Sequence, residues 1–250
     1  MFLDVIDIRA FYASALGGIA RRLVVQRIRA IWPNIKDMRL AGVGYAAPYL
    51  GMFKEEALLT AAFMPARQGV SRWPAEGLCL TALVEPDGLP LRDGSIDRLL
   101  MVHGIEMAEN LPAMLNEAWR VLAPGGHLLM VVPNRRGMWA RFDSTPFGHG
   151  RPFSRGQLIQ LLRDAYLAPE YWKYALYMPP FSRSFLLRSA IAWERIGSWL
   201  WPGFGGVIIV EATKQVYAAG ATQAARKRKI MFQPGVKPVP ASPRVKHSFK

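Results

Sequence analysis

Two short apolar runs frame a helical stretch in residues 85–133, and this segment constrains the fold more than any other part of the chain. The first run covers residues 97–103 and the second residues 127–132. Each is long enough for one buried strand, whereas residues 111–122 have a length and apolar spacing typical of a helix. Strands that alternate with helices favour a mostly parallel sheet covered on both faces. The segment therefore predicts an α/β fold.

The same alternation extends over most of the chain. We expect helices at residues 7–32, 49–55, 111–122, 154–165 and 183–200, and strands at 38–43, 58–63, 78–85, 97–103, 127–132, 171–177 and 207–215. Pro33 ends the first helix, because the residue before a proline avoids helical geometry. The connection between residues 64 and 77 is too short and too rich in proline and glycine for a full helix.

Composition limits the number of domains. A chain of 250 residues with 51% apolar content can bury one sizeable core but hardly two. Of the net charge of +14, eight charges lie in residues 221–250, which contain no acid, and six in residues 1–220. We expect a helical cap at residues 1–34, one domain at 35–220 and a basic, proline-containing disordered tail at 221–250. A solvated tail is favoured over contact with nucleic acid, anionic lipid or an acidic partner.

Three features favour the cytoplasm. The single cysteine, Cys79, lies in an apolar run, where a small buried side chain is expected, and it cannot form an internal disulfide. The first seven residues carry Asp4 and Asp7 without a basic residue, unlike a secretory signal. The longest uncharged apolar stretch, residues 196–210, is broken by proline and glycine, so no membrane span is expected.

The parts of residues 85–133, taken in order, resemble the second half of a class I methyltransferase that uses S-adenosylmethionine. The resemblance rests on Leu-Pro at 89–90, Ser-Ile-Asp at 95–97, Trp-Arg-Val-Leu at 119–122 and Pro-Gly-Gly at 124–126. It implies a Rossmann-like sheet of seven mostly parallel strands with an antiparallel C-terminal strand and helices on both faces. It covers roughly residues 35–215 and implies methyl transfer to a small molecule.

The implied cofactor site begins at a glycine-rich turn formed by Gly42, Val43, Gly44 and Ala46. Glycines lack Cβ, so the backbone can approach the amino-acid part of the cofactor closely. The family has an acid where this chain has Leu40 and a third glycine where it has Ala46. The missing acid removes a partner for the cofactor's amino group. We expect Gly44→Leu to block the site without unfolding the chain.

The second implied contact lies at Met64 and Pro65, where the family's acid would bind both ribose hydroxyls. Met64 occupies the acidic position. A hydrogen bond to a charged group contributes about 1.5–3 kcal/mol, roughly 10- to 100-fold in affinity. Backbone groups, Arg67 or Gln68 would have to compensate for this loss.

The third contact is implied at Glu85 or Asp87, followed by Gly88 and Leu89. The family places an acid there for the adenine amino group and a backbone amide for its ring, and the spacing favours Glu85. The same residues are also typical of an acidic β-turn built on positions 86–88. Both interpretations stay open.

The fourth contact is implied at Val102 and His103, where family members line the pocket beside the sulfonium. His103 could be a pocket wall, a general base or a hydrogen-bonded histidine at a strand end. No histidine pairs with another ligand type at metal-site spacing, so we expect no metal. Methyl transfer needs alignment and exclusion of water rather than a fixed catalytic signature, so the catalytic residue stays unknown. Candidate substrate walls are Tyr12, Asn134, Arg135 and residues 141–153.

Two function classes follow. The first is an S-adenosylmethionine-dependent methyltransferase with an unidentified, small-molecule substrate. The second is a catalytically lapsed relative that binds and regulates a protein partner through apolar and basic surfaces. Residues 181–201 supply such a surface, since apolar side chains alternate there with Arg183, Arg188 and Arg195; a packed amphipathic helix is favoured, and an anionic membrane is a further alternative. The two function classes differ in whether the cofactor binds although Leu40 and Met64 stand where the family has acids.

Overall fold

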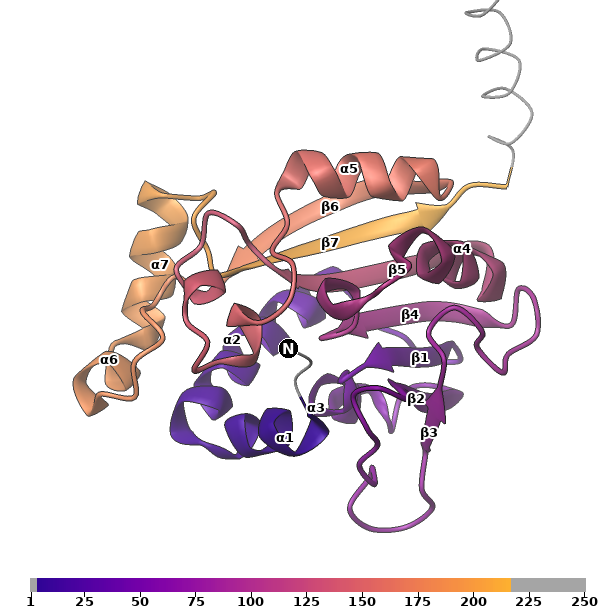
Figure 1. The fold of residues 1–250 in the computed structure, drawn as a ribbon, viewed down its shortest axis with the longest axis horizontal. Coiled ribbons are helices and arrows are strands. Elements are labelled where there is room, and N and C mark those ends of the chain that lie inside the picture. Colours follow the sequence, from indigo (N-terminus) through magenta and orange to yellow (C-terminus); the bar gives the residue numbers. More distant parts are fainter. Residues whose placement is uncertain (1–3, 217–250) are drawn as a thin grey trace, which may run out of the picture. The chain divides into compact units, whose positions relative to one another are not determined.

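The computed structural model describes residues 4–216, whose strands form one seven-stranded sheet (Figure 1). The strands are β1 (Arg39–Gly44), β2 (Leu59–Pro65), β3 (Thr81–Val84), β4 (Ile96–Val102), β5 (Leu122–Pro133), β6 (Leu167–Ala175) and β7 (Val207–Lys214). The α-helices are α1 (Val5–Ala13), α2 (Ala15–Ile31), α3 (Ala47–Leu50), α4 (Leu111–Val121), α5 (Arg155–Asp164), α6 (Ser184–Arg188) and α7 (Ala190–Leu200). Single 3₁₀ turns lie at Gly51–Phe53, Ile105–Met107, Trp139–Arg141 and Pro146–Gly148.

The strand order is β3-β2-β1-β4-β5-β7-β6. The first five strands in this order run parallel, and β7 lies antiparallel between β5 and β6. The strand order reverses between β1 and β4, so the loops that follow these two strands lead to opposite faces of the sheet. In folds of this kind, ligands bind at this point, outside the carboxyl ends of the strands. The predicted fold class, including the antiparallel C-terminal strand, is confirmed.

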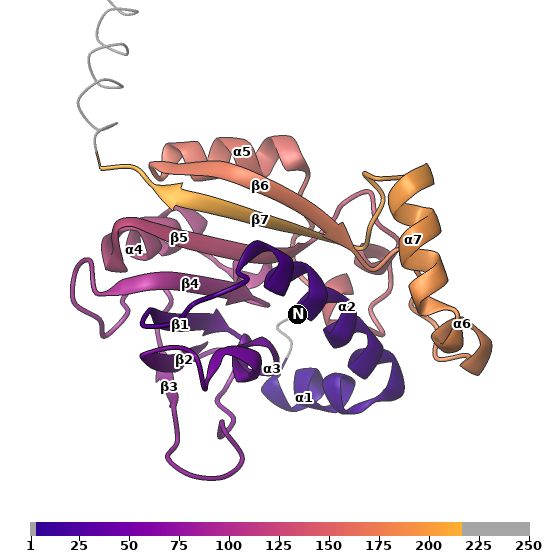
Figure 2. The same cartoon turned by 180° about the vertical axis from the view of Figure 1, so that it is seen from behind.

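Two layers of helices cover the sheet. On one face α4 packs against β5 and α5 against β6, in a cluster that includes Met114, Leu115 and Leu158. On the other face α2 and α3 pack through residues such as Leu23 and Ile28 (Figure 2). Helix α4 begins where the Asn110 side chain accepts a hydrogen bond from the Ala113 amide. In the described part of the chain, no helix is both long and apolar enough to span a membrane.

The predicted single helix at residues 7–32 is wrong, because the chain breaks into α1 and α2 at Ser14. Ser14 is extended (ψ 161°), and its side chain caps α2 by accepting from the Gly17 amide. A Cβ on Gly17 would lie 1.9 Å from the Phe11 carbonyl oxygen, so the two helices can turn this tightly only around a glycine. The turn brings α1 over the end of the sheet instead of along its face.

Other predicted boundaries shift more modestly. The predicted helix at residues 183–200 is two helices separated at Ser189, and the aromatic strand begins at Leu167 instead of residue 171. The connection between β2 and β3 contains no helix, as expected. The predicted tail, residues 221–250, lies outside the described residues.

The expectation that Cys79 is buried is wrong. Strand β3 starts only at Thr81, and Cys79 precedes it as an exposed free thiol. No helix covers this sheet edge within residues 66–80, so the apolar run that precedes β3 stays at the surface and Leu78 is 85% exposed. A hydrogen bond with Thr81 lowers the pKa of the Cys79 thiol.

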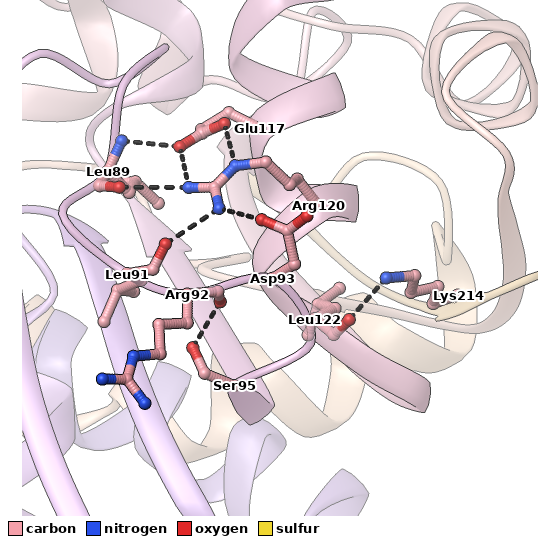
Figure 3. A network of polar contacts seen from close by, with 9 residues as sticks. All are labelled: Leu89, Leu91, Arg92, Asp93, Ser95, Glu117, Arg120, Leu122 and Lys214. Carbon is pink, nitrogen blue, oxygen red and sulfur yellow. Dashed lines mark hydrogen bonds and ion pairs between the residues drawn. The ribbon is translucent and has the colours of Figure 1, made fainter.

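The loop before β4 is fastened to α4 by Arg120 (Figure 3). The Arg120 guanidinium donates to both Glu117 carboxylate oxygens, to Asp93 and to the carbonyls of Leu89 and Leu91. The hydrogen bonds from Arg120, together with its positive charge, lower the pKa of Glu117. The Leu-Pro and Trp-Arg-Val-Leu segments that carried the sequence resemblance therefore meet in one polar cluster, which fixes the start of β4.

Candidate cofactor site at the carboxyl ends of the strands

The predicted glycine turn lies directly against the end of β4. Gly44 pairs with Val102 in the parallel register and has a φ of 81°. A Cβ at Gly44 would lie 2.3 Å from the Val102 carbonyl oxygen, and one at Gly42 would lie 2.7 Å from the Ala46 Cβ. Both glycines are therefore required by packing within the protein. Gly44→Leu would clash with backbone, so the expectation that this variant leaves the fold intact is wrong.

His103 stands at the centre of a buried polar network. Its Nε2 lies 2.7 Å from the Tyr12 hydroxyl, and its Nδ1 lies 3.2 Å from the Glu106 carboxylate. The His103 carbonyl accepts a hydrogen bond from the Gln68 side chain at 3.0 Å. The residue has a left-handed backbone (φ 51°), which points its ring away from β4 and under Phe147.

Tyr12, which contacts this histidine, packs against two further tyrosines. The Tyr12 hydroxyl is 2.7 Å from the Tyr49 hydroxyl, and the Tyr12 ring stacks on that of Tyr45 at 5.9 Å. Burial raises the pKa of Tyr12 well above its usual value, and it does the same for Tyr49. The phenols are therefore neutral at physiological pH and act as hydrogen-bonding groups, not as bases.

The amino-terminal end of α1 covers the ends of β1 and β2. Val5 and Ile8 form an apolar cluster with Tyr45, Ala47 and Met64. The Val5 amide also donates to the Gln68 carbonyl at 2.8 Å, which ties α1 to the loop after β2. Met64, at the position implied for the ribose-binding acid, is fully buried in this cluster.

The adenine end of the implied site is a small cavity of about 140 Å³. Pro65 lines it at the end of β2, Glu85 and Asp87 line it after β3, and Arg67 and Glu109 complete one wall. The Gly88 amide donates to the Glu85 carbonyl at 3.0 Å, so the predicted acidic turn is also present. The Leu89 amide, implied for the adenine ring, donates to Glu117 at 2.7 Å. Ligand pockets commonly measure about 300–1,000 Å³.

The implied cofactor does not fit the residues in this arrangement. Gly44, Met64, Val102 and His103 do meet at one edge of the sheet, but Tyr12, Tyr45 and Ile8 fill the space over them. Glu106 and Gln68 each have one buried oxygen without a hydrogen-bond partner. Those two acceptors suit a donor the size of a water molecule. An adenosyl group would require α1 to leave the strand ends.

The candidate substrate walls separate into packing residues and exposed residues. Asn134 is buried, and its side chain donates to the carbonyls of Gly203 and Gly205, so it holds the chain before β7. Arg135 is exposed. From the loop at residues 141–153, Phe147 lies on His103.

The sequence did not indicate Tyr45, Tyr49 or Glu106 as site residues. Tyr45 and Tyr49 are four positions apart on the helical turn after β1, and Glu106 follows His103 by three positions. These spacings were the available signal in the sequence. That the residues lie close to α1 could not be predicted without the break at Ser14.

One further cluster involves metal-ligand types. His127, Glu170 and Glu211, from β5, β6 and β7, offer ligand atoms within 4.8 Å of one another. The sequence could not indicate it, because the three residues lie on separate strands. The Glu211 carboxylate already accepts from the Trp32 indole at 2.7 Å and lies 3.0 Å from His127. This contact explains the cluster without an ion.

The sheet order with its antiparallel β7 is the fold of class I methyltransferases. Residues 59–130 match the model of the methyltransferase-domain family, in agreement with the resemblance found in the sequence. No curated protein matches the chain significantly. Solved structures share the fold at low sequence identity.

Three structural relatives illustrate this. A possible histamine N-methyltransferase from Thermotoga maritima has a TM-score of 0.58 and 18% identity, covering 83% of this chain and 94% of its own. A putative methyltransferase bound to the Trm112 activator from Haloferax volcanii has a TM-score of 0.58 and 16% identity, with 84% and 97% covered. The [4+2]-cyclase SpnF has a TM-score of 0.53 and 19% identity, with 77% and 80% covered. These similarities show the fold alone.

Proposed function

We propose that this chain is a methyltransferase-fold protein in which the cofactor site has become an internal core, and that it acts by binding a partner. The observation that carries this proposal is the Tyr12–His103 hydrogen bond, which ties α1 to the strand ends where the resemblance implies a cofactor. The absence of acids at Leu40 and Met64 supports it, because both residues are fully buried among apolar neighbours. A buried acid at either position would lose its solvation.

The fold is compatible with this proposal. A structural relative with the same architecture is described as a [4+2]-cyclase, and one architecture can support many functions. For this chain we propose the domain boundaries expected from the sequence: a cap at residues 1–34, a core domain at 35–220 and a tail at 221–250.

A second candidate is an active S-adenosylmethionine-dependent methyltransferase acting on a small molecule. Two observations favour it: the family match over residues 59–130, and the cavity where Glu85 and Asp87 stand beside Pro65. In this alternative, α1 moves away from Met64 and His103 when the cofactor enters. The residues that would then hold it are Gly42, Val43, Gly44, Ala46, Met64, Pro65, Glu85, Asp87, Gly88, Leu89, Val102 and His103.

Titration calorimetry of the whole protein with S-adenosylmethionine and S-adenosylhomocysteine, up to millimolar concentrations, tests the proposal. We expect no binding heat and no thermal stabilisation. A ligand at about one hundred times its dissociation constant would stabilise the fold by about 2.7 kcal/mol, which a melting experiment detects easily.

Binding at micromolar affinity would overturn the proposal and establish the second candidate. The variant Glu85→Gln would then locate the adenine end, since it should weaken binding while Glu76→Gln, an exposed residue of the preceding loop, should not.

A further inference from the structure

The helical pair α6 and α7 stands beyond the end of the sheet, at the carboxyl ends of β5 and β6 (Figures 1 and 2). One side of α7 is anchored. The Glu194 carboxylate accepts a hydrogen bond from the Tyr177 amide at 2.7 Å, and a Cβ on Gly197 would lie 2.5 Å from the Tyr177 Cβ. These contacts fix which side of α7 faces the protein and leave the opposite side outward.

The outward side is apolar and aromatic. Of the seventeen large apolar side chains exposed in residues 4–216, eight lie in residues 181–204. Trp199 is 80% exposed and Phe185 is 76% exposed, with Ile191, Ile196 and Trp201 between and beside them. Exposed apolar side chains scattered singly are ordinary, whereas a concentration of this kind marks a binding surface.

The charge on this surface has one sign. The exposed charged residues of residues 176–206 are Arg183, Arg188 and Arg195, all cationic. The only acid in this stretch, Glu194, is 4% exposed and lies 3.6 Å from Arg27 of α2. An apolar face whose own exposed charges, within residues 176–206, are all arginines is complementary to a surface that is anionic outside and apolar beneath.

A groove continues the apolar face toward the strand ends. It has a volume of about 460 Å³ and lies between α7 and the segments that follow β5 and β6. Trp193, Trp201 and Phe204 line its apolar side, and Arg136 and Arg141 contribute cations. This pairing suits an amphiphile with an apolar chain and an anionic group.

We propose that α6 and α7 bind the surface of an anionic membrane, with Phe185 and Trp199 entering the headgroup region and the three arginines contacting anionic headgroups. Tryptophan favours the interface between water and lipid, because its ring is apolar and its N–H is polar. Arginine can keep its charge among the headgroups while its stem lies along apolar surface. A helix with one apolar face and a cationic border lies in the plane of the interface.

This inference names the partner of the binding function proposed above, and it rests on that proposal only for its biological role. The two tests are independent. If the protein binds both the cofactor and the vesicles, only the lapsed-site proposal is overturned. If it binds neither, only the membrane proposal is overturned.

Co-sedimentation of the full chain with vesicles tests the inference. One set of vesicles contains phosphatidylcholine, and the other contains equal parts of phosphatidylcholine and phosphatidylserine. We expect binding to the anionic vesicles. Phe185→Glu combined with Trp199→Glu should lower the partition coefficient at least about tenfold. Replacement of Arg188 by Gln should lower it about fivefold, the effect of one cation near an anionic surface.

The matched control is Leu58→Glu combined with Leu78→Glu. These side chains are 69% and 85% exposed, lie at the β2–β3 end of the sheet and introduce the same charge change. All variants keep residues 221–250, so any contribution of that basic segment cancels.

Three results would overturn the proposal. The first is a wild-type chain that does not sediment with anionic vesicles. The second is an equal loss of binding in the control variant, which would show a general charge effect. The third is self-association without vesicles that disappears in the Phe185 and Trp199 variant, which would assign the surface to a second copy of the chain.

Discussion

Two polar regions of the molecule differ in how far apart their partners lie in the sequence. Before the start of β4, Arg120 makes five hydrogen bonds to a loop and a helix within about thirty residues of it in sequence. At the carboxyl ends of β1 and β4, Tyr12 and His103 are 91 positions apart and meet only because α1 folds back. The first region contains the Leu-Pro and Trp-Arg-Val-Leu parts of the methyltransferase resemblance, and the second has Leu40 and Met64 where that resemblance implies acids.

This difference indicates which features of the family pattern support the fold. A Cβ at Gly42 or Gly44 would meet neighbouring atoms closely, whereas Leu40 and Met64 are buried apolar residues where the resemblance implies acids. The two glycines are therefore needed for packing whether or not a cofactor binds.

The largest expected effect concerns Gly44. Gly44→Ala should lower the free energy of unfolding by about 3 kcal/mol, because alanine disfavours this positive φ and its Cβ would clash with the Val102 carbonyl. Urea denaturation measures the loss. The control is Gly18→Ala in α2, where a Cβ meets no atom within 4 Å and should stabilise the helix by up to about 1 kcal/mol. If Gly44→Ala is as stable as the wild type, packing does not explain the retained glycine.

The next effect concerns Arg120, which holds the loop before β4. Arg120→Ala should cost about 2 kcal/mol, since it leaves Glu117 and two loop carbonyls without their donor. The Arg120 side chain is 32% exposed, so the loss is smaller than for a fully buried pair. Thermal melting should show a decrease of about 4–8 °C. Arg120→Lys keeps the charge but not the planar geometry and should recover only part of the loss. Full recovery by lysine would show that charge alone fixes the loop.

The sequence predicted the fold more completely than the site. The Arg120 cluster and the Tyr12–His103 contact show why. The loop before β4, α4 and β5 are adjacent in sequence, so their motif and their contacts lie in one readable segment. The Tyr12–His103 contact depends on the break at Ser14, which a helical apolar pattern running through residues 7–32 concealed. Cys79 was mistaken for a buried residue because apolar content predicts a strand but not whether a helix covers it.

A smaller effect tests the internal core directly. Tyr12→Phe removes a hydroxyl that is 2.7 Å from both Tyr49 and His103, and it should lower the free energy of unfolding by about 1 kcal/mol. Tyr171→Phe, at an exposed ring, is the control and should change it by less than about 0.5 kcal/mol. Denaturant titration compares the two. An unchanged stability in Tyr12→Phe would mean that α1 does not rest firmly on His103, and the lapsed-site proposal would lose its main support.

The smallest effect concerns the contact between α2 and α7, through Arg27 and Glu194. Burial raises the pKa of Glu194 even though Arg27 lies 3.6 Å away, so desolvation outweighs the attraction between them. The fold therefore favours protonated Glu194. This contribution to stability is present below the usual glutamate pKa of about 4.3 and is lost as the pH rises through the raised pKa. Glu194→Gln cannot ionise and should still accept from the Tyr177 amide.

Glu194→Gln should therefore be more stable than the wild type at neutral pH, by about 1 kcal/mol, with the difference vanishing near about pH 4. Melting at both pH values checks it, with Glu76→Gln as an exposed control of the same charge change. A variant that is less stable at neutral pH would show that the ion pair to Arg27 holds α2 against α7. In that case α2 would be held in place by α7. Any movement of α1 to admit a cofactor would then have to occur at Ser14.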